Sequence, residues 1–279
     1  MVVRTISMFL VIWVALAGCA GSRSSSGTFF FIQMSDTQFG MFNADKSFEK
    51  ETAHFEQAVA AANKLKPAFV IVTGDLVNKP FDSAQVREYK RIAATLNPGI
   101  KLYNVPGNHD IGNIPATEDI ASYNRMFGPD YYTFSQDRML GIVLNSMLLH
   151  SPQKAMQKAS AQEAWLQSVL ENTKNEKWQH IVVFLHHPFY LEQPGEANGY
   201  FNIPLDTRKK YLELFQKYSI RYVFAGHYHR NAYGEPGSLQ MVTTGPVGKP
   251  LGRDSSGFRI VKVTPQAISH EYYPLDSLH

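Results

Sequence analysis

The sequence predicts an α/β domain in which short buried strands alternate with amphipathic helices. Apolar runs too short for ordinary helices recur in the first half of the chain, at 29–34, 68–72 and 100–105. Segments with apolar residues at helical spacing lie between them, at 48–64 and 83–96. Each apolar run is followed directly by Asp, Asn or His, and ligands of open α/β sheets bind at the carboxyl ends of the strands.

Polar or turn-forming residues end each element of this first half. The helix at 83–96 is followed by Asn97-Pro98-Gly99, through which a helix does not continue. The three strands are followed by the groups Ser35-Asp36, Gly74-Asp75 and Gly107-Asn108-His109-Asp110.

The second half is richer in strands. We expect a strand pair at 131–135 and 139–145, and then a helix opened by Ser160 and Glu163 as a capping box. The strands at 181–185 and 222–225 again precede polar groups, which are His186-His187-Pro188 and Gly226-His227-Tyr228-His229. The remaining expected elements are a helix at 207–218 and strands at 239–243, 258–263 and 268–272.

Charge and cysteine content exclude several classes of protein. The formal net charge of the 279 residues is +3, and no block of like charge stands out along the chain. We therefore expect neither a stable nucleic-acid partner nor binding to a membrane surface through basic charge, because both kinds of protein carry a clustered face of Lys and Arg. The single cysteine, Cys19, excludes an internal disulfide and any zinc site built from several cysteines.

The N-terminus has the order of a secretory signal. Arg4 precedes the apolar run Met8 to Ala17, which is shorter than the roughly 20 residues of a membrane-spanning helix. Leu16-Ala17-Gly18-Cys19 follows, and this stretch resembles a bacterial lipoprotein lipobox. The alternative is an ordinary signal peptide with an incidental cysteine.

The lipobox resemblance implies three parts and a location. Residues 1–18 would be the signal peptide, 19–27 the lipidated Cys19 with a flexible tether, and 28–279 the folded domain. The protein would be held to the membrane through its N-terminal lipid. Ala20 after the cysteine favours the outer membrane of the bacterial envelope, facing the periplasm.

The polar groups after the strands form a candidate metal site. Carboxylate, amide oxygen and imidazole suit divalent Mn, Fe, Zn or Mg, and no thiolate is present for a structural zinc site. The candidate ligands are Asp36, Gln38, Asp75, Asn108, His186, His227 and His229.

These groups resemble the calcineurin-like metallophosphoesterase superfamily, which is marked by D-x-H, GD, GNH, a later His and GHxH in this order. The match covers residues 29 to 273, with Gln38 in place of the first His. The resemblance implies a four-layer αββα sandwich with two mixed sheets flanked by helices. It also implies hydrolysis of a phosphorylated substrate.

The resemblance implies a two-metal site in which Asp75 bridges both ions. The other ligands would be Asp36, Gln38 and His229 for the first ion, and Asn108, His186 and His227 for the second. Two ions about 3.5–4 Å apart share a bridging water, and the resulting hydroxide attacks phosphorus.

Residues beside the ligands are the catalytic candidates. His109 would bind the phosphate or protonate the leaving oxygen. Asn78 would orient His109 through its side-chain oxygen, and Asp110 is grouped with them as a catalytic candidate.

The chain departs from the superfamily pattern at Gln38. An amide oxygen is a harder donor than imidazole, which predicts a looser first site or one tuned to manganese or magnesium. The alternative is that Gln38 does not coordinate and a water takes its place. Asp36-Thr37-Gln38, Gly74-Asp75-Leu76-Val77-Asn78 and the glycine-rich stretch 244–258 resemble a narrower branch, the complete S-transactivated protein-like phosphoesterases. In that stretch Lys249 and Arg253 would contact substrate phosphate, unless it is a solvated hairpin.

The substrate is less clearly indicated. We expect a phosphomonoesterase, and the alternatives are a phosphodiesterase on nucleotides or lipid head groups and a non-catalytic surface lipoprotein. The segment 193–202 lacks periodicity and is expected to form a loop at the mouth of the site. Aromatic candidates for lining the site are Phe39, Phe42, Tyr123, Phe127, Phe189, Tyr190, Tyr200 and Phe201.

Overall fold

The structure, a computed structural model, describes residues 27–234, 237 and 239–277. The predicted signal peptide, Cys19 and nearly all of the tether lie outside these residues. Among the described residues, no helix combines the length and the apolar composition that crossing a membrane requires.

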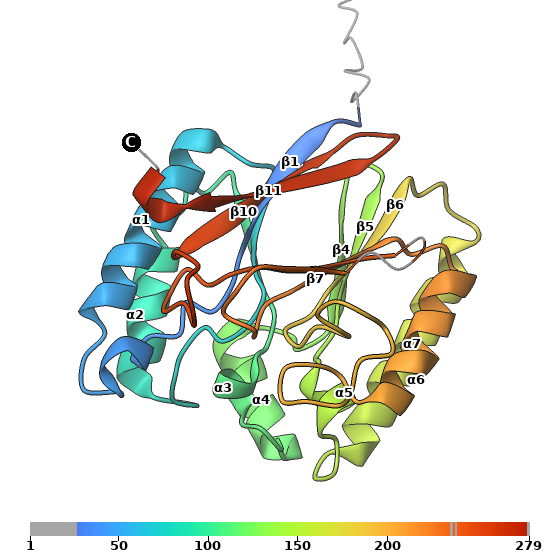
Figure 1. Cartoon of the computed structure of the whole chain (residues 1–279), viewed down its shortest axis with the longest axis horizontal. Helices are drawn as coiled ribbons and strands as arrows, with labels where there is room; N and C mark the ends of the chain where they lie inside the picture. Colours follow the sequence, from blue (N-terminus) through green and yellow to red (C-terminus); the bar gives the residue numbers. More distant parts are fainter. Residues whose placement is uncertain (1–26, 235–236, 238, 278–279) are drawn as a thin grey trace, which may run out of the picture.

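Two mixed β-sheets form the centre of the molecule (Figure 1). In the first sheet three parallel strands continue into an antiparallel pair, in the order β11-β10-β1-β2-β3. Its strands are β1 (Phe29–Met34), β2 (Phe69–Val72), β3 (Lys101–Asn104), β10 (Gly257–Val263) and β11 (Ile268–Pro274).

The second sheet has four parallel strands with an antiparallel strand at each edge, in the order β4-β5-β6-β7-β9-β8. Its strands are β4 (Tyr132–Gln136), β5 (Met139–Val143), β6 (His180–Phe184), β7 (Tyr222–Ala225), β8 (Ala232–Gly234) and β9 (Gln240–Thr243).

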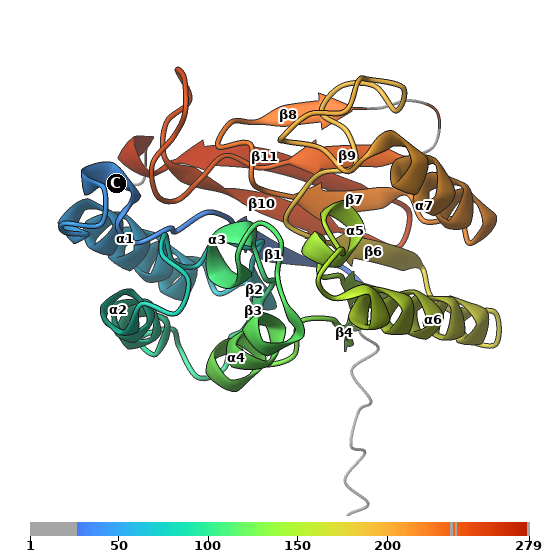
Figure 2. The same ribbon diagram turned by 90° about the horizontal axis from the view of Figure 1, so that it is seen from below.

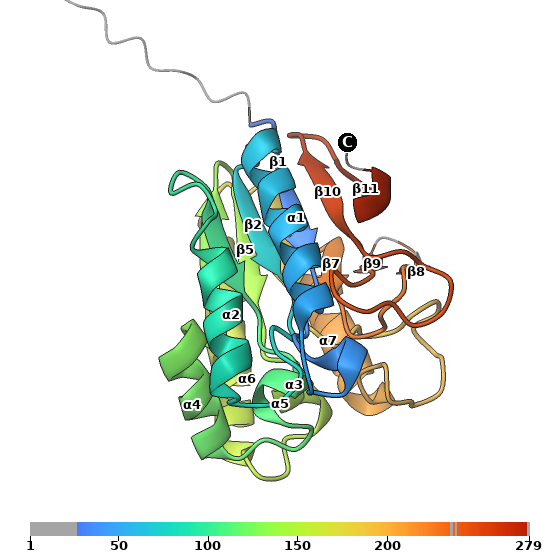
Figure 3. The ribbon, with the colours of Figure 1, turned by 90° about the vertical axis from the view of Figure 1, so that its left-hand side faces the viewer.

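Helices cover the outer face of each sheet, as Figures 2 and 3 show from below and from the side. Helices α1 (Glu49–Leu65), α2 (Ser83–Ala93) and α4 (Thr117–Phe127) lie on the side of the first sheet, and α6 (Met156–Thr173) and α7 (Leu205–Lys217) on the side of the second. Short helices fill the connections: α3 (Asn108–Ile111), α5 (Met147–His150), η1 (Met41–Asn43) and η2 (Leu275–Ser277). The predicted four-layer sandwich is therefore confirmed.

Alternation along β1 shows how the layers are joined. Phe31 packs between the sheets, where its ring stacks on Phe69 at 4.6 Å and meets the edge of Phe184 at 5.7 Å. Ile32 and Met34 point the other way, into the core shared with the helices. Each such buried side chain contributes roughly 1.5–3 kcal/mol relative to exposure.

The predicted strands all form, with ends within about two residues, but one helix start was wrong. Helix α6 begins at Met156, so Ser160 lies inside it and is not an N-cap. The residues before Ser160 include Ala, Lys, Gln and Met, which are strong helix formers, and the helix extends back over them. The prediction also missed α4 and the three-residue strand β8.

A buried glutamine joins the two sheets at the carboxyl ends of their strands. Gln33 donates from Nε2 to Thr73 Oγ1 at 3.1 Å and to the carbonyl oxygen of Ala225 at 3.0 Å. Its Oε1 accepts from the hydroxyl of Thr244 at 2.7 Å. Because β1, β2, β7 and β9 are tied together here, the loops that follow them start from fixed positions.

Candidate metal centre

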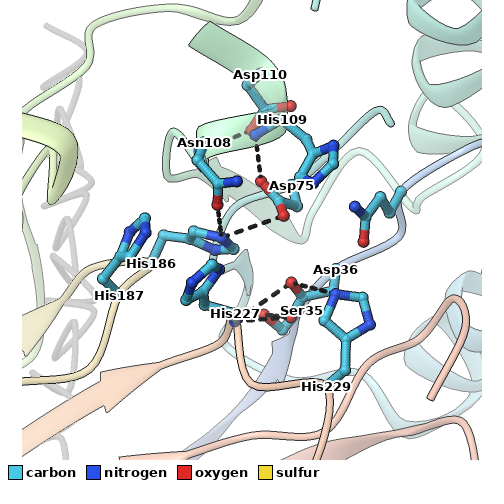
Figure 4. Close-up of polar contacts among 12 residues, drawn as sticks. Ser35, Asp36, Asp75, Asn108, His109, Asp110, His186, His187, His227 and His229 are labelled. Carbon is cyan, nitrogen blue, oxygen red and sulfur yellow. Dashed lines mark hydrogen bonds and ion pairs between the residues drawn. The ribbon is translucent and has the colours of Figure 1, made fainter. Parts of the chain in front are cut away.

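The predicted ligands converge on one place although they are spread over almost 200 residues of sequence. Figure 4 shows Asp36, Asp75, Asn108 and the three histidines facing one another above the strand ends. All of the candidate ligand side chains are buried, and they are Asp36, Gln38, Asp75, Asn108, His186, His227 and His229.

The donor atoms form two clusters that share one carboxylate. Donor atoms of Asp75, His186 and His227 lie within 4.8 Å of one another, and so do those of Asp36, Asp75 and His229. Asp75, the residue predicted to bridge, is thus the side chain that the two clusters have in common.

Backbone carbonyls fix the direction of two of the imidazoles. His186 Nδ1 lies 2.8 Å from the carbonyl oxygen of Thr73, which accepts only, so Nδ1 carries the proton. The other nitrogen, Nε2, therefore faces Asn108 Oδ1 at 3.1 Å and Asp75 Oδ2 at 3.3 Å. His229 is held in the same way, with Nδ1 on the carbonyl of Lys249 at 2.6 Å and Nε2 at 3.3 Å from Asp36 Oδ1.

Two buried acceptor atoms of the candidate ligands have no hydrogen-bond partner. His227 donates from Nε2 to the carbonyl of Tyr200 at 3.0 Å, which leaves Nδ1 as a buried lone pair without a donor. Gln38 donates from Nε2 to Asn78 Oδ1 at 3.2 Å, and its Oε1 is likewise buried without a donor. Unpaired buried acceptors are costly, and a divalent cation would satisfy both, so the donor set fits metal ions.

Opposite charges inside the centre set the protonation of its metal-free form. Burial alone would raise the pKa of Asp75, but the charges of the neighbouring histidines, chiefly His186, together with its hydrogen bond to His186 hold that pKa below the usual range. Burial likewise opposes ionisation of Asp36, and the charge of His229 holds the pKa of Asp36 low.

The pKa values of the histidines are shifted in opposite directions. Burial would lower the pKa of His186, but the charge and hydrogen bond of Asp75, together with the charge of Asp36 and the hydrogen bond to Thr73, raise the pKa to about 9. Burial, with repulsion from His186, lowers the pKa of His227 to about 3. The acids are thus paired with protonated imidazoles, and cations that bind here replace protons.

The backbone is unusual at the residues that carry the donors. A positive φ is uncommon for residues other than glycine and costs on the order of 1–3 kcal/mol where the surroundings impose it. Five candidate ligands have it, and they are Asp36 (φ 50°), Gln38 (39°), Asp75 (52°), His227 (69°) and His229 (54°). The tight turns after the strands account for this and aim the side chains at one point.

Two glycines of the motifs allow the loops to approach one another. A Cβ on Gly107 would lie 2.2 Å from Asp75 Oδ1, and one on Gly226 would lie 1.8 Å from Ser35 Oγ and 2.7 Å from Asp36 Oδ2. Any larger residue at either position would displace a candidate ligand.

His109 lies beside the centre, as predicted, but its orientation has a different origin. Its backbone N–H donates to Asp75 Oδ1 at 2.8 Å, and its ring Nδ1 donates to the main-chain carbonyl of Asn78 at 2.6 Å. The prediction that Asn78 orients His109 through its side-chain oxygen was therefore wrong. That side chain accepts from Gln38 and donates from Nδ2 to Asp45 at 2.8 Å.

Asp110 is placed to hold the loops together, which differs from the catalytic role expected for it. Its Oδ1 accepts from the backbone N–H groups of Leu76 and Val77, at 2.9 and 3.2 Å, and its Oδ2 from that of Gly107 at 2.8 Å. The side chain is fully buried, and burial together with the charge of Asp75 raises its pKa well above the usual value. Asp110 thus positions the loops that carry Asp75 and Asn108.

His187, next to a candidate ligand, has its own partners. Its ring Nδ1 and the hydroxyl of Ser146 lie 3.0 Å apart, and its backbone N–H donates to the same hydroxyl at 3.0 Å. Burial and the charge of His227 hold its pKa well below the usual value. The choice of His186 over His187 as the ligand therefore agrees with the geometry.

Some of the residues predicted to contact substrate or to line the site lie beside the metal centre, and others do not. Lys249 reaches the centre through its main-chain carbonyl, and Arg253 is exposed in the loop after it. Among the aromatics, Tyr200 and Phe201 lie against the ring of His227, with centroids at 4.9 and 5.5 Å. Four others are buried in the apolar cores and do not line the site, namely Phe39, Tyr123, Phe189 and Tyr190.

Tyr200, one of the aromatic candidates from the sequence, makes hydrogen bonds in the site that the sequence did not indicate. Its carbonyl accepts from His227, its hydroxyl accepts from Asn108 Nδ2 at 3.3 Å, and the residue is 53% exposed. It therefore touches two candidate ligands and solvent at once. The loop at 193–202, which carries it, is thereby placed at the mouth of the site, as expected.

Known proteins resemble this chain in sequence and fold. Residues 31–231 match the family model described as calcineurin-like phosphoesterase. The serine/threonine-protein phosphatase CPPED1 of Homo sapiens is 40% identical over 268 residues, covering 90% of this chain and 85% of that protein. The protein of the same name from Bos taurus is 38% identical over 271 residues, covering 92% and 87%.

Solved structures of low sequence identity share the fold. A dimetal phosphatase from Danio rerio superposes with a TM-score of 0.63 at 14% identity, over 88% of this chain and 99% of that one. The purple acid phosphatase PPD1 from yellow lupin gives a TM-score of 0.66 at 14% identity, over 90% of this chain and 52% of that one.

Proposed function

The chain belongs to the calcineurin-like phosphoesterase family, and from this membership we propose that it is a phosphomonoesterase that uses two divalent metal ions. Hydrolysis of phosphoric esters with divalent metal follows from the family and from the candidate centre. The number of ions and the preference for monoesters are the parts that we propose.

The observation that carries the proposal is the carboxylate of Asp75, which belongs to both donor clusters. Asp36, Gln38 and His229 would complete one site. Asn108, His186 and His227 would complete the other. Two bound ions supply an activated water and take up charge from the phosphoryl oxygens.

The protein supplies a proton donor beside the centre. His109 is fixed by Asn78 and by Asp75, and its ring is partly exposed. Because Nδ1 already donates to a carbonyl, Nε2 is the atom that is left to meet substrate. Protonated at Nε2, the ring would donate to the leaving oxygen or to a phosphoryl oxygen.

The substrate class that we propose is a phosphorylated serine or threonine side chain. The relatives at 38–40% identity are named serine/threonine-protein phosphatases, which supports this class. The exposed ring of Tyr200 beside His227 offers an apolar surface for the part of the substrate next to the phosphate. Substrate contacts of Lys249 and Arg253 stay a prediction.

The test compares two chromogenic esters and a phosphopeptide on one manganese-loaded sample. We expect p-nitrophenyl phosphate and a phosphoserine peptide to be hydrolysed at least about tenfold faster than bis(p-nitrophenyl) phosphate. The Asn108→Ala variant is the matched control for contaminating phosphatase. Faster cleavage of the diester would contradict the monoesterase proposal, and unaltered turnover by Asn108→Ala would favour a non-catalytic role.

We also propose that Cys19 carries a lipid that holds the domain to the outer membrane, facing the periplasm. The apolar run before it, the small residues around it and its being the single cysteine support this. Mass spectrometry of the N-terminal peptide, with Cys19→Ser as control, tests it. An unmodified cysteine in membrane-fractionated protein would contradict it.

A further inference from the structure

The connections that lead into the parallel strands lie at the edge of the sheets opposite the metal centre. In the pairing register Phe29 lies beside Val263, and Met139 lies beside His180. In Figure 1 the start of β1 and the turns of the β4–β5 and β10–β11 pairs lie along the upper edge, whereas α3 lies at the lower edge. We call this surface the amino-end face, and it comprises residues 27–29, 64–68, 99–101, 137–138, 176–179, 219–222 and 262–267.

The amino-end face carries a surplus of basic side chains. Its acidic residues are Asp137 and Glu176. Its basic residues, all exposed, are Lys64, Lys66, Lys101, Arg138, Lys177, Arg221 and Lys262. The formal net charge of the whole chain is only +3, so positive charge is concentrated on this face. The expectation from the sequence that no basic face exists was therefore wrong. Each connection contributes only one or two of these residues, so they form no block of charge along the chain.

The face also marks where the N-terminal segment joins the domain. Gly27 lies against Gln179 and Pro265, since a Cβ on it would be 3.3 Å from Gln179 Oε1 and from Pro265 Cγ. The residues from Cys19 to Ser26 span at most about 28 Å when fully extended. A lipid on Cys19 would therefore keep this face, rather than the metal centre, close to the bilayer.

We propose that the amino-end face docks on an anionic phospholipid surface and turns the metal centre away from the membrane. The proposal rests on the lipid anchor proposed above. Clustered Lys and Arg near a bilayer are attracted to anionic head groups, and the attraction decays over a Debye length of about 8 Å. Arg138 is fixed on the face, because Nε and Nη2 both donate to the carbonyl of Lys177, at 2.9 and 2.6 Å.

Vesicle flotation of the full chain with Cys19→Ser tests the face without the lipid. The readout is the ratio of binding to vesicles with about one-third phosphatidylglycerol over binding to pure phosphatidylcholine. Residues 1–18, which carry Arg4, are the same in every variant, so comparing the ratio between variants isolates the charge of the face. The face variant combines Lys66→Gln, Lys101→Gln, Lys177→Gln and Lys262→Gln. The control neutralises exposed lysines elsewhere and combines Lys50→Gln, Lys90→Gln, Lys154→Gln and Lys209→Gln.

We expect the face variant to lower the ratio at least about tenfold, and the control to change it less than about twofold. High salt should abolish the preference for anionic vesicles, and both variants should hydrolyse a soluble ester like the parent. Equal ratios in the two variants would overturn the proposal. Tighter binding to a short DNA duplex than to anionic vesicles would overturn the choice of lipid as the partner.

The two experiments can contradict the lipid anchor and the docking of the amino-end face separately. Charge-dependent flotation with no lipid on Cys19 would contradict the anchor and leave the face supported. A lipidated Cys19 with a charge-independent ratio would support the anchor and contradict the face.

Discussion

Gln38 donates from Nε2 to the side-chain oxygen of Asn78 over 3.2 Å, and its Oε1 is left buried without a hydrogen-bond partner. The amide oxygen is thus available as a ligand at the position where the superfamily pattern has its first His. Asn78 is in turn held by Asp45, which accepts from its Nδ2 at 2.8 Å.

Replacing Gln38 should therefore weaken one metal site. We expect Gln38→Leu to lower the manganese affinity of one site by about 10–100-fold and to leave the other unchanged. Gln38→His should shift preference toward zinc, since imidazole is a softer donor than amide oxygen. Calorimetric titration with each metal measures this. Two unaltered binding steps in both variants would show that Gln38 does not coordinate.

Replacing His109 should impair turnover and leave metal binding intact. We expect His109→Gln to lower kcat by about 10²–10⁴-fold, because a positioned proton donor is lost. Metal content serves as the control, since the ring of His109 is not among the clustered donors. A variant with normal kcat would remove His109 from the reaction.

Replacing Asp110 tests whether this residue positions the loops or takes part in the reaction. Asp110→Asn places an NH₂ group where one carboxylate oxygen accepts from backbone N–H groups. We expect the free energy of unfolding to fall by about 1–3 kcal/mol. Activity should fall no more than metal loading does, and urea unfolding with turnover at saturating manganese measures both. Full stability with lost turnover would restore the catalytic role predicted from the sequence.

The elevated pKa of His186 makes metal binding depend on pH. Its pKa in the metal-free fold is about 9, raised from 6.5, so at neutral pH the ring holds a proton that a metal must displace. Manganese affinity should therefore rise with pH up to about 9 and then level off. Calorimetry in two buffers of different ionisation enthalpy detects the released protons. An affinity that is constant between pH 6.5 and 8.5, with no proton released, would contradict this.

The sequence predicts the strands and the convergence of their loops because both depend on local patterns. Buried runs such as 29–34 and 222–225 match strands β1 and β7 end for end. Polar residues that directly follow parallel strands must share one edge. Asp36, Asp75, His186 and His227 could therefore be placed together without a structure.

What the sequence could not predict depends on tertiary contacts. His109 meets the main-chain oxygen of Asn78 and not its side-chain oxygen, and residue types do not indicate which of the two it is. The hydrogen bonds of Asp110 to Leu76 and Val77 join two loops that are distant in sequence. Aromatic residues near motifs look alike in sequence, yet Tyr190 is buried and Tyr200 is exposed. The amino-end face likewise arises from residues that are distant along the chain.

The most direct test of the two-metal account is the metal content and manganese-dependent turnover of Asp75→Asn beside the parent protein. Equilibrium dialysis followed by elemental analysis should give two metal ions per parent chain. The variant should bind far less than one ion and lose at least about 10³-fold in kcat, because Asp75 is common to both donor clusters. A variant that still binds two ions, or that turns over like the parent, would contradict the account.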